Sequence, residues 1–401
     1  SSRNIFKRCS TSMTSVRPGL KFGIVVGEIS GDALGAKLLP ALRERFSNYN
    51  IDFIGTAGPL LHSQGMKSFF PLADIAVMGI VPVIKRLPSL LRRIEDTANR
   101  LIAEKIDCLI IIDSPDFTHR VARKVKDALP HIPIINYVSP SVWAWRPGRA
   151  KAMRSYIDHV LALLPFEPVA HQKLGGPPCT YVGHPLIERR ELFQSSPDEA
   201  HRRSSQPPIL LVLPGSRRSE IARLMPVFGE AISQLKHNHH LEFDLILPAV
   251  DHLKSEIEDA LKTWRVKPRL IFGEAAKYHA FRKAYTALAA SGTVTLELAM
   301  AHVPMAVGYR VGAIEGQIRH FITVPSVVLA NLIIGENIVP ERIQGACNPA
   351  QLVEDLLPLM SDTPERRRQL TGFDRLDQLM AIDEVSPSMK AVDVIARYVI
   401  K

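Results

Sequence analysis

Short apolar runs alternate with longer amphipathic stretches along nearly the whole chain. Runs of aliphatic residues are typical of strands buried on both faces of a parallel sheet, whereas the amphipathic stretches have helical spacing. In the first half the runs predict strands at Phe22–Val26, Asp52–Gly55, Cys108–Asp113, Ile132–Val138 and Val160–Leu164. Helices are predicted between them at Ala33–Phe46, Pro88–Glu104 and Thr118–Leu129.

A second alternation follows a polar, linker-like stretch between Glu191 and Gln206. Its strands are predicted at Ile209–Leu213, Phe243–Leu247, Leu270–Phe272, Thr286–Ala290 and Met305–Tyr309. Its helices are predicted at Arg218–Lys236, His252–Trp264 and Val294–Ala301, and the chain from Pro349 onward has a helical pattern. Strands that alternate with helices indicate the α/β class, here with two doubly wound parallel sheets.

The two alternations divide the chain into predicted domains, since 401 residues exceed the usual size of a single core. Residues 1–18 are expected to be a disordered or non-native tail, because they are polar and basic and lack the apolar segment of a secretion signal. A first Rossmann-like domain is predicted over 19–190, a second over 207–365, and C-terminal helices over 366–401.

Composition narrows the classes of protein that fit this pattern. Hydrophobic residues make up 46% of the chain and charged residues 22%, as in a well-packed globular protein. The four cysteines are scattered without the spacing of a metal site, which indicates a reduced, cytoplasmic chain. No apolar stretch approaches the roughly 20 residues of a membrane helix. The net charge of +10 suits anionic lipids or phosphorylated substrates as well as nucleic acid, but no nucleic-acid-binding motif accompanies it.

A glycine-containing turn follows the first predicted strand. Gly27 and Gly31 allow a ligand to approach the main chain, and the next helix begins with free N–H groups. The glycine spacing is not that of a dinucleotide-binding fingerprint. Because Glu28 and Asp32 would repel a phosphate, we expect this turn, with Ser30, to bind sugar hydroxyls or an acceptor substrate.

Two strand–turn–helix segments in the second half suit a diphosphate. In the first, Arg217 stands where a helix begins, a position that costs stability unless an anion offsets the cation. In the second, Ser291, Gly292 and Thr293 form an N-cap-like cluster suited to phosphate. Glu297 lies one helical turn beyond Thr293, where a carboxylate can accept hydrogen bonds from both hydroxyls of a ribose.

An aspartate, Asp113, ends the most apolar of the predicted strands, in the place where α/β enzymes keep reactive groups. Transfer of a sugar to a hydroxyl needs a base that removes the proton. Asp116 is the competing candidate, although it can instead cap the helix that follows. The residues alone leave these two nearly even.

Two of the chain's three tryptophans, Trp143 and Trp145, lie two residues apart after the strand predicted at Ile132–Val138. Indoles this close together, preceded by Ser139 and followed by Arg146, favour a binding role over core packing alone. A plug between two domains remains the alternative for one of them.

Asn331 is a lone amide among aliphatic residues. An amide that is buried must find hydrogen-bond partners, so a satisfied core asparagine is the default interpretation.

Apolar and basic residues are mixed just before the helix predicted at Pro88–Glu104. The apolar ones are Val81, Val83, Ile84, Leu87, Leu90 and Leu91, and the basic ones are Lys85, Arg86, Arg92 and Arg93. Their spacing predicts an apolar stripe with basic flanks, suited to a membrane surface, with a core-facing helix as the alternative. Pro82 and Pro88 are expected to break the helix into short pieces.

The segment Tyr137–Arg146 resembles the signature of the lipid-A-disaccharide synthases, a family of GT-B glycosyltransferases. Residues 113–117 are similar to the family's Asp-x-Pro-Asp-Phe motif, and the family has an asparagine near the donor where Asn331 stands. Pro82 departs from the family, which commonly has an acidic residue there. Family-like segments occur in order at 22–35, 75–84, 109–117, 136–146, 162–167, 181–186, 211–221, 289–310 and 325–336.

The resemblance implies a GT-B fold, with two Rossmann-like domains that face each other across a cleft and a last helix that packs back on the first domain. It implies an inverting transfer from UDP-2,3-diacylglucosamine to 2,3-diacylglucosamine 1-phosphate (lipid X), with release of UDP and without a cofactor or metal. Asp113 would be the base, and Arg217 with the helix at Thr293 would stabilise the UDP diphosphate. The enzyme would be cytoplasmic and bind the anionic surface of the inner membrane; a homodimer is compatible with this, and no nucleic-acid partner is expected.

Two alternatives differ from this hypothesis in testable ways. Another GT-B enzyme, such as a peptidoglycan glycosyltransferase or a UDP-sugar epimerase, would share the Ser291–Glu297 turn but has no reason to carry the double-tryptophan segment. A non-catalytic membrane-binding protein on the same scaffold would keep its ligand affinity after Asp113→Asn and have no activity to lose.

Overall fold

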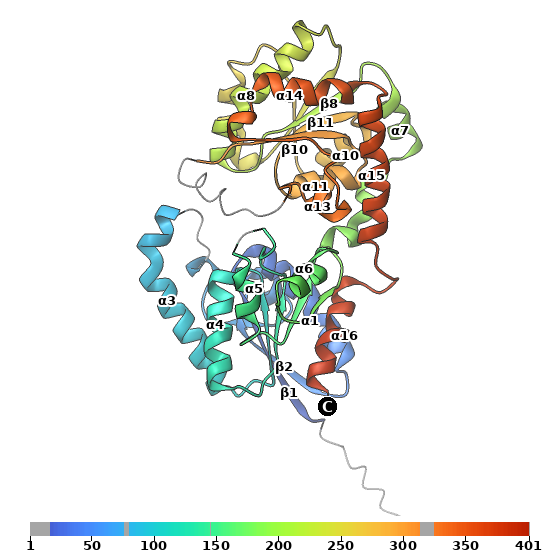
Figure 1. The fold of residues 1–401 in the computed structure, drawn as a ribbon. Coiled ribbons are helices and arrows are strands. Elements are labelled where there is room, and N and C mark those ends of the chain that lie inside the picture. Colours follow the sequence, from blue (N-terminus) through green and yellow to red (C-terminus); the bar gives the residue numbers. More distant parts are fainter. Residues whose placement is uncertain (1–16, 76–79, 145, 313–324, 401) are drawn as a thin grey trace, which may run out of the picture. The chain divides into compact units, whose positions relative to one another are not determined.

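The chain folds into two parallel sheets with helices on both faces (Figure 1). The computed structural model describes residues 17–75, 80–144, 146–312 and 325–400, without the side chains of 80–86. Contacts divide the chain into two compact units. The first contains 1–138, 156–159 and 391–401, and the second contains 139–155 and 160–390.

The first sheet, in the part of the chain that is described, has seven strands in the order β3-β2-β1-β4-β5-β6-β7. They are β1 (Gly19–Val26), β2 (Asn50–Thr56), β3 (Lys67–Ser68), β4 (Cys108–Ile112), β5 (Ile134–Tyr137), β6 (His159–Ala162) and β7 (Cys179–Tyr181). The central strands β1 and β4 are almost wholly buried and pair in parallel, with Val26 opposite Ile112. This register places the turn after β1 beside the turn after β4.

Helices flank both faces of the β1–β5 part of this sheet. They are α1 (Ile29–Arg45), α2 (Pro59–Ser63), α3 (Ile80–Ala103), α4 (Pro115–Ala128) and α16 (Pro387–Val399). Figure 1 shows α3 and α4 side by side on one face, and α1 with α16 on the other. Arg45 of α1 pairs with Asp393 of α16 (3.6 Å), and the Tyr398 hydroxyl contacts His159 Nδ1 (2.8 Å), which attaches the end of the chain to this unit.

The structure corrects the expectation that prolines break the segment before residue 104. α3 is continuous from Ile80 to Ala103 and contains Pro88. Pro82 lies in the first turn, where its missing N–H would have no helical partner anyway, and Pro88 removes one interior hydrogen bond from a helix of 24 residues. Among the described residues no helix is both long and apolar enough to cross a bilayer.

The second sheet has six strands in the described residues, in the order β10-β9-β8-β11-β12-β13. They are β8 (Ile209–Leu213), β9 (Asp244–Ala249), β10 (Arg269–Phe272), β11 (Thr286–Ala290), β12 (Met305–Tyr309) and β13 (Glu341–Ile343). The helices of the second unit are α5 (Gly148–Met153), α6 (Glu167–Lys173), α7 (Pro197–Ser204), α8 (Arg218–His237), α9 (Lys254–Leu261), α10 (Glu274–Lys283), α11 (Thr293–Met300), α13 (Leu329–Ile334), α14 (Pro349–Leu356) and α15 (Pro364–Met380).

Each face of the second sheet has its own hydrophobic core, because successive residues of a strand point to opposite faces. Leu211 of β8 packs in a cluster with residues of α10, α11, α13 and α15. Its neighbour Val212 packs in the other cluster, with residues of α8 and α14. These cores hold α8 and α11 with their first turns at the carboxyl ends of β8 and β11.

The polar stretch between Glu191 and Gln206 contains a helix, α7, where the sequence predicted no regular element. Ser196 and Glu199 form a reciprocal capping box at its start, with Pro197 in the first position. Arg203 then anchors the helix by donating to the carbonyl oxygens of Phe281 and Ala301 (both 2.9 Å). A polar segment can fold in this way when its charged groups bond to the main chain of a neighbouring core.

The predicted domain boundaries remain a proposal. Contacts assign 139–155 and 160–190 to the second unit, whereas β6 and β7 belong to the first sheet. Residues 1–16 of the predicted tail lie outside the described part of the chain.

Candidate active site

Asp113 directly follows β4, and both it and Ser114 have left-handed backbone angles (φ 58° and 44°). Such angles cost of the order of 1–3 kcal/mol in residues other than glycine and are concentrated at functional sites. The carboxylate is held at two points, because Oδ1 accepts from the Ser114 N–H (2.9 Å) and Oδ2 from the Ser30 hydroxyl (2.6 Å). The strained turn thus presents a half-buried carboxylate in a defined orientation.

Gly27 allows the turn after β1 to approach this carboxylate. A Cβ at Gly27 would lie 2.5 Å from the Cβ of Ser114, so any side chain would push the two turns apart. Gly31 is buried in the first turn of α1, and Glu28 is exposed at the N-cap. The predicted group Gly27, Glu28, Ser30 and Gly31 is therefore assembled beside Asp113.

Asp32, whose charge we expected to repel a phosphate from this turn, is instead a structural residue. Its side chain is fully buried, and its oxygens accept from the backbone N–H groups of Gly58 (2.8 Å), Leu60 (2.8 Å) and Leu61 (3.0 Å). It closes the N-terminus of α2.

Asp116 is exposed in the first turn of α4, which begins at Pro115. A carboxylate there interacts favourably with the helix dipole. Its setting therefore differs from that of Asp113, which two hydrogen bonds orient.

The N-terminus of α11 presents its first N–H groups without a side-chain cap. Gly292 is the N-cap residue and Thr293 is exposed, while the Ser291 hydroxyl is 3.4 Å from the Val327 carbonyl oxygen. An uncapped helix N-terminus combines free donors with the positive end of the dipole. This geometry suits an anionic oxygen.

Glu297 lies on α11 with only 8% of its surface exposed, as its apolar neighbours suggested. Its Oε2 accepts from Lys277 Nζ (2.9 Å) and its Oε1 from the Tyr278 hydroxyl (2.8 Å). Burial, with the adjacent Glu297 charge, raises the pKa of Tyr278 above its ordinary value, so the phenol stays a donor. Each carboxylate oxygen has a second lone pair and can accept one more hydrogen bond.

At the start of α8, unlike that of α11, a side chain already accepts hydrogen bonds from the backbone N–H groups. The N–H groups of Ser216 and Arg217, which we expected to bind a diphosphate, donate to Glu220 Oε2 (2.9 and 3.1 Å). The Arg217 side chain is 77% exposed and extends outward. These two N–H groups are thus already bonded, whereas the start of α11 has no side-chain cap. No group of three or more potential metal ligands occurs among the described residues.

Asn331 uses its whole amide inside its own segment. Its Nδ2 donates to Ser326 Oγ (3.2 Å) and the Val339 carbonyl (2.9 Å), and its Oδ1 accepts from the N–H groups of Ile338 (3.1 Å) and Val339 (3.0 Å). With 2% exposure it orders the loop around α13.

Asn331→Leu should destabilise the protein, because it leaves buried N–H groups without acceptors. We expect the free energy of unfolding to fall by about 3 kcal/mol in urea denaturation. The exposed Asn337→Ala is the matched control, with a change within about 0.5 kcal/mol. Unchanged stability together with weakened UDP binding would instead place Asn331 in contact with the donor.

Ser139 and Trp143 are both anchored to α6. Ser139 is buried with its Oγ 2.7 Å from His171 Nε2, and the Trp143 indole donates to Glu167 Oε1 (3.1 Å). Trp143 also packs edge-to-face on Phe166, with centroids 4.9 Å apart. Trp145 lies outside the described residues.

Sequence reasoning missed the side chains that hold the predicted residues in place. They are Glu167, His171, Glu220, Lys277 and Tyr278. Segment 162–167 was singled out as family-like, but nothing in its spacing pointed to a buried carboxylate.

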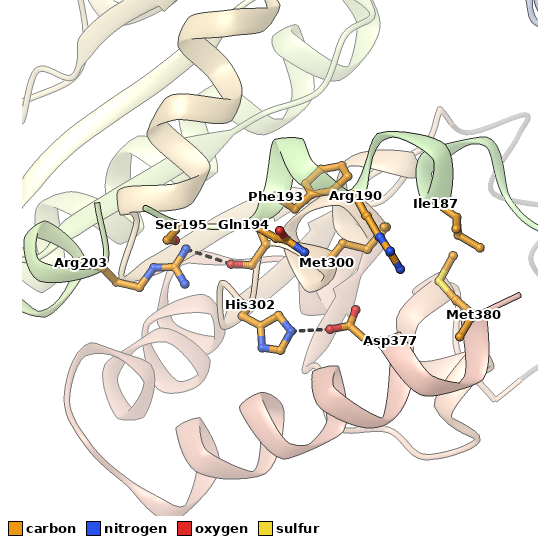
Figure 2. Close-up of a pocket in the computed structure, with 12 residues that line it drawn as sticks. Ile187, Arg190, Phe193, Gln194, Ser195, Arg203, Met300, His302, Asp377 and Met380 are labelled. Carbon is orange, nitrogen blue, oxygen red and sulfur yellow. Dashed lines mark hydrogen bonds and ion pairs between the residues drawn. The ribbon is translucent and has the colours of Figure 1, made fainter. Parts of the chain in front are cut away.

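A cavity of about 410 Å³ lies at the opposite, C-terminal end of α11 (Figure 2). Met300, Ala301 and His302 line it, and His302 Nε2 contacts Asp377 (2.7 Å). The predicted site residues do not line this cavity. The eight residues of α11 separate it from Thr293 by about 12 Å.

The fold defines the class of protein. MurG of Acinetobacter baumannii is similar in structure, with a TM-score of 0.57 and 15% identity over 95% of this chain and 100% of that one. UDP-GlcNAc 2-epimerase of Neisseria meningitidis, solved with UDP-GlcNAc, has a TM-score of 0.57 and 13% identity over 94% of this chain and 100% of that one. Two parallel-sheet α/β domains of this kind are the GT-B fold, which confirms the predicted fold class.

Sequence similarity then identifies the family. The model of the lipid-A-disaccharide synthetase family matches residues 22–393. Lipid-A-disaccharide synthase of Rhodopseudomonas palustris strain HaA2 is 52% identical over 93% of this chain and 94% of its own length. That of Rhodospirillum centenum is 37% identical over 96% of each. The chain belongs to the lipid-A-disaccharide synthase family and is a glycosyltransferase of lipid A synthesis, and the non-catalytic alternative is not favoured.

Proposed function

We propose that this protein joins UDP-2,3-diacylglucosamine to the 6-hydroxyl of 2,3-diacylglucosamine 1-phosphate, giving the lipid A disaccharide 1-phosphate and UDP. The observation that carries the proposal is the family match over residues 22–393. The fold alone would not select this reaction, because similar structures include an epimerase as well as MurG.

Asp113 is the proposed base. The acceptor oxygen attacks the anomeric carbon while the bond from that carbon to the UDP diphosphate breaks, and the hydroxyl proton moves to the carboxylate. Ser30 holds one carboxylate oxygen and the Ser114 N–H the other, so the remaining lone pairs have a fixed direction. The exposed Asp116 is the second candidate.

The second unit is proposed to bind the donor. The uncapped N-terminus of α11, at Ser291–Thr293, faces the diphosphate as negative charge develops on the leaving UDP, and the extended Arg217 adds a cation. Glu297 accepts from the ribose hydroxyls with the lone pairs that Lys277 and Tyr278 leave open. Asn331 supports this unit through the loop around α13.

The test is incubation of the purified protein with both acylated sugars in detergent, with UDP release and disaccharide mass followed together. Equal amounts of UDP and of the disaccharide are expected. UDP binding without any disaccharide would overturn the proposed reaction and leave a general UDP-sugar protein. Release of UDP without the acceptor would indicate hydrolysis instead.

The start of α3 is proposed to contact an anionic membrane. The side chains of Val81, Val83, Ile84, Lys85 and Arg86 lie outside the described residues, but Leu87 and Leu91 are 40% and 47% exposed. They are one turn apart and hence on one face of the helix. Arg93, in contrast, pairs with Asp74 and stacks on Phe70, so it supports the fold.

Replacing both Leu87 and Leu91 by Asp should weaken binding to phosphatidylglycerol vesicles by roughly tenfold or more, because two apolar side chains no longer enter the bilayer. Turnover of detergent-dissolved substrates should be unchanged. Leu379→Asp, at a site with 43% exposure on α15, is the control for an added charge. Equal vesicle binding by all three proteins would remove α3 from the membrane surface.

A further inference from the structure

Helix α6 presents two buried polar side chains, Glu167 and His171, one turn apart. Their exposed fractions are 3% and 0%. Residues four apart lie on the same face of a helix. Both contact one short segment, since Glu167 Oε1 accepts from the Trp143 indole (3.1 Å) and His171 Nε2 is 2.7 Å from Ser139 Oγ. One contact at each end thus fixes a segment of five residues, Ser139–Trp143.

We propose that Glu167 and His171 are positioning residues that hold Ser139 and Trp143 in the geometry that binds substrate. We call this pair the α6 clamp. The inference rests on the proposed function and on the substrate-binding role that the sequence predicts for Ser139 and Trp143. Because Glu167 and His171 are both buried, they act through Ser139 and Trp143 and do not touch the substrate themselves.

The surroundings of Glu167 fit an ordering role. Its two oxygens accept from the Trp143 indole and from the Leu164 N–H (both 3.1 Å). Burial raises the pKa of Glu167 to about 7, and the partly buried Cys179 on β7, whose thiol pKa burial also raises, lies close enough to interact with it. A carboxylate accepts both bonds, whereas a Gln side chain turns an N–H₂ group toward one of the two donors.

His171 fixes the Ser139 hydroxyl through its protonated Nε2. The Ser139 Oγ also lies 2.9 Å from the Pro140 carbonyl, which can only accept. Since the hydroxyl has one hydrogen, donation to Pro140 leaves His171 Nε2–H as the donor to Oγ. Burial lowers the pKa of His171 to about 4, so the ring is neutral near pH 7. A Cβ at Gly176 would lie 2.5 Å from Nδ1, so only a glycine at this position leaves room for the ring.

The experiment compares KM and kcat for both acylated sugars in Glu167→Gln, His171→Leu and His171→Gln. We expect the first two to raise KM for at least one sugar by about tenfold, with kcat within about threefold and UDP affinity unchanged. His171→Gln should recover most of the loss, because its amide can place a donor near the position of Nε2. Val169→Ala, at an exposed position of α6, is the control and should match the wild type.

A double-mutant cycle with Trp143→Phe separates positioning from general damage. If Glu167 acts through the Trp143 indole, Glu167→Gln should raise KM no further in the Trp143→Phe background. Independent, additive effects would overturn the inference. If Glu167→Gln keeps the activity and KM of the wild type, the α6 clamp is contradicted but the proposed function is not. If the wild-type protein itself forms no disaccharide, the proposed function is contradicted.

The pH dependence of stability tests the burial of Glu167, and its comparison with KM separates a positioning residue from a structural one. The folded protein binds the Glu167 proton more tightly than the unfolded chain, with a pKa near 7 against 4.5, so stability contributed by the protonated form is lost as pH rises through about 7. Glu167→Gln should therefore gain in Tm relative to the wild type between about pH 5 and pH 8 while its KM is worse. A variant that loses Tm equally across this range, together with UDP affinity, would identify Glu167 as a structural residue only.

Discussion

Asp113→Asn should reduce kcat for disaccharide formation by about a hundredfold to ten-thousandfold, the usual effect of removing a general base. The amide keeps the shape of the side chain and can still accept from the Ser114 N–H, while its N–H₂ group can donate to the Ser30 oxygen once that hydroxyl turns away. It has no basic oxygen that can take the acceptor proton. KM for both sugars and the affinity for UDP should change little, because the group acts in the transition state. Steady-state measurement of UDP and disaccharide checks this.

Two further variants locate the effect. Asp127→Asn removes an exposed carboxylate from the same helix that follows Asp113 and should retain full activity. Asp116→Asn should cost much less than Asp113→Asn, since Asp116 is exposed in the first turn of α4. The reverse order of the two losses would transfer the base to Asp116 and leave Asp113 as a strained structural residue.

Glu297→Gln should raise the dissociation constant of UDP by about tenfold to a hundredfold. The neutral amide loses a charge-assisted hydrogen bond to the ribose, which contributes about 1.5–3 kcal/mol. It also leaves Lys277, whose ion pair with Glu297 spans 2.9 Å, without its partner. Isothermal titration calorimetry with UDP alone measures this dissociation constant without any acylated substrate.

Tyr278→Phe is the matched control for Glu297. It removes the hydroxyl that donates to Oε1 (2.8 Å) but keeps the carboxylate and the ring, which is 3% exposed. UDP affinity should change by about threefold or less, because the carboxylate still accepts from the ribose. Unaltered UDP affinity in Glu297→Gln, with a lower unfolding midpoint, would show that Glu297 only braces α10 against α11.

The pattern of hydrophobic and polar residues was sufficient to predict the two sheets and most of their strands. β8, β11 and β12 begin and end where predicted, because an uninterrupted apolar run fits only a strand that is covered on both faces. The same patterning failed between residues 191 and 206. There the capping box at Ser196 and Glu199 was visible in the sequence, but the polar composition outweighed it.

Positions at the ends of strands could also be inferred from the sequence. Asp113 follows β4 in the first sheet, and Gly292 lies just after β11 in the second, so each stands at the carboxyl end of a parallel strand, where α/β folds place binding residues. What each residue contacts there could not be inferred. Asp32 and Glu28 are equally acidic and stand four residues apart, yet the structure buries the first under α2 and leaves the second exposed.

The sequence by itself determined the class of fold and the family and supplied the candidate site residues, because hydrophobic periodicity and short motifs are local properties of the chain. Only the tertiary structure decided which polar groups meet. Glu220 closes the start of α8 while α11 remains uncapped, and α6 holds Ser139 and Trp143 through two buried side chains. These pairings depend on how helices pack onto sheets, and a buried donor or acceptor is satisfied by whichever partner that packing brings within hydrogen-bond distance.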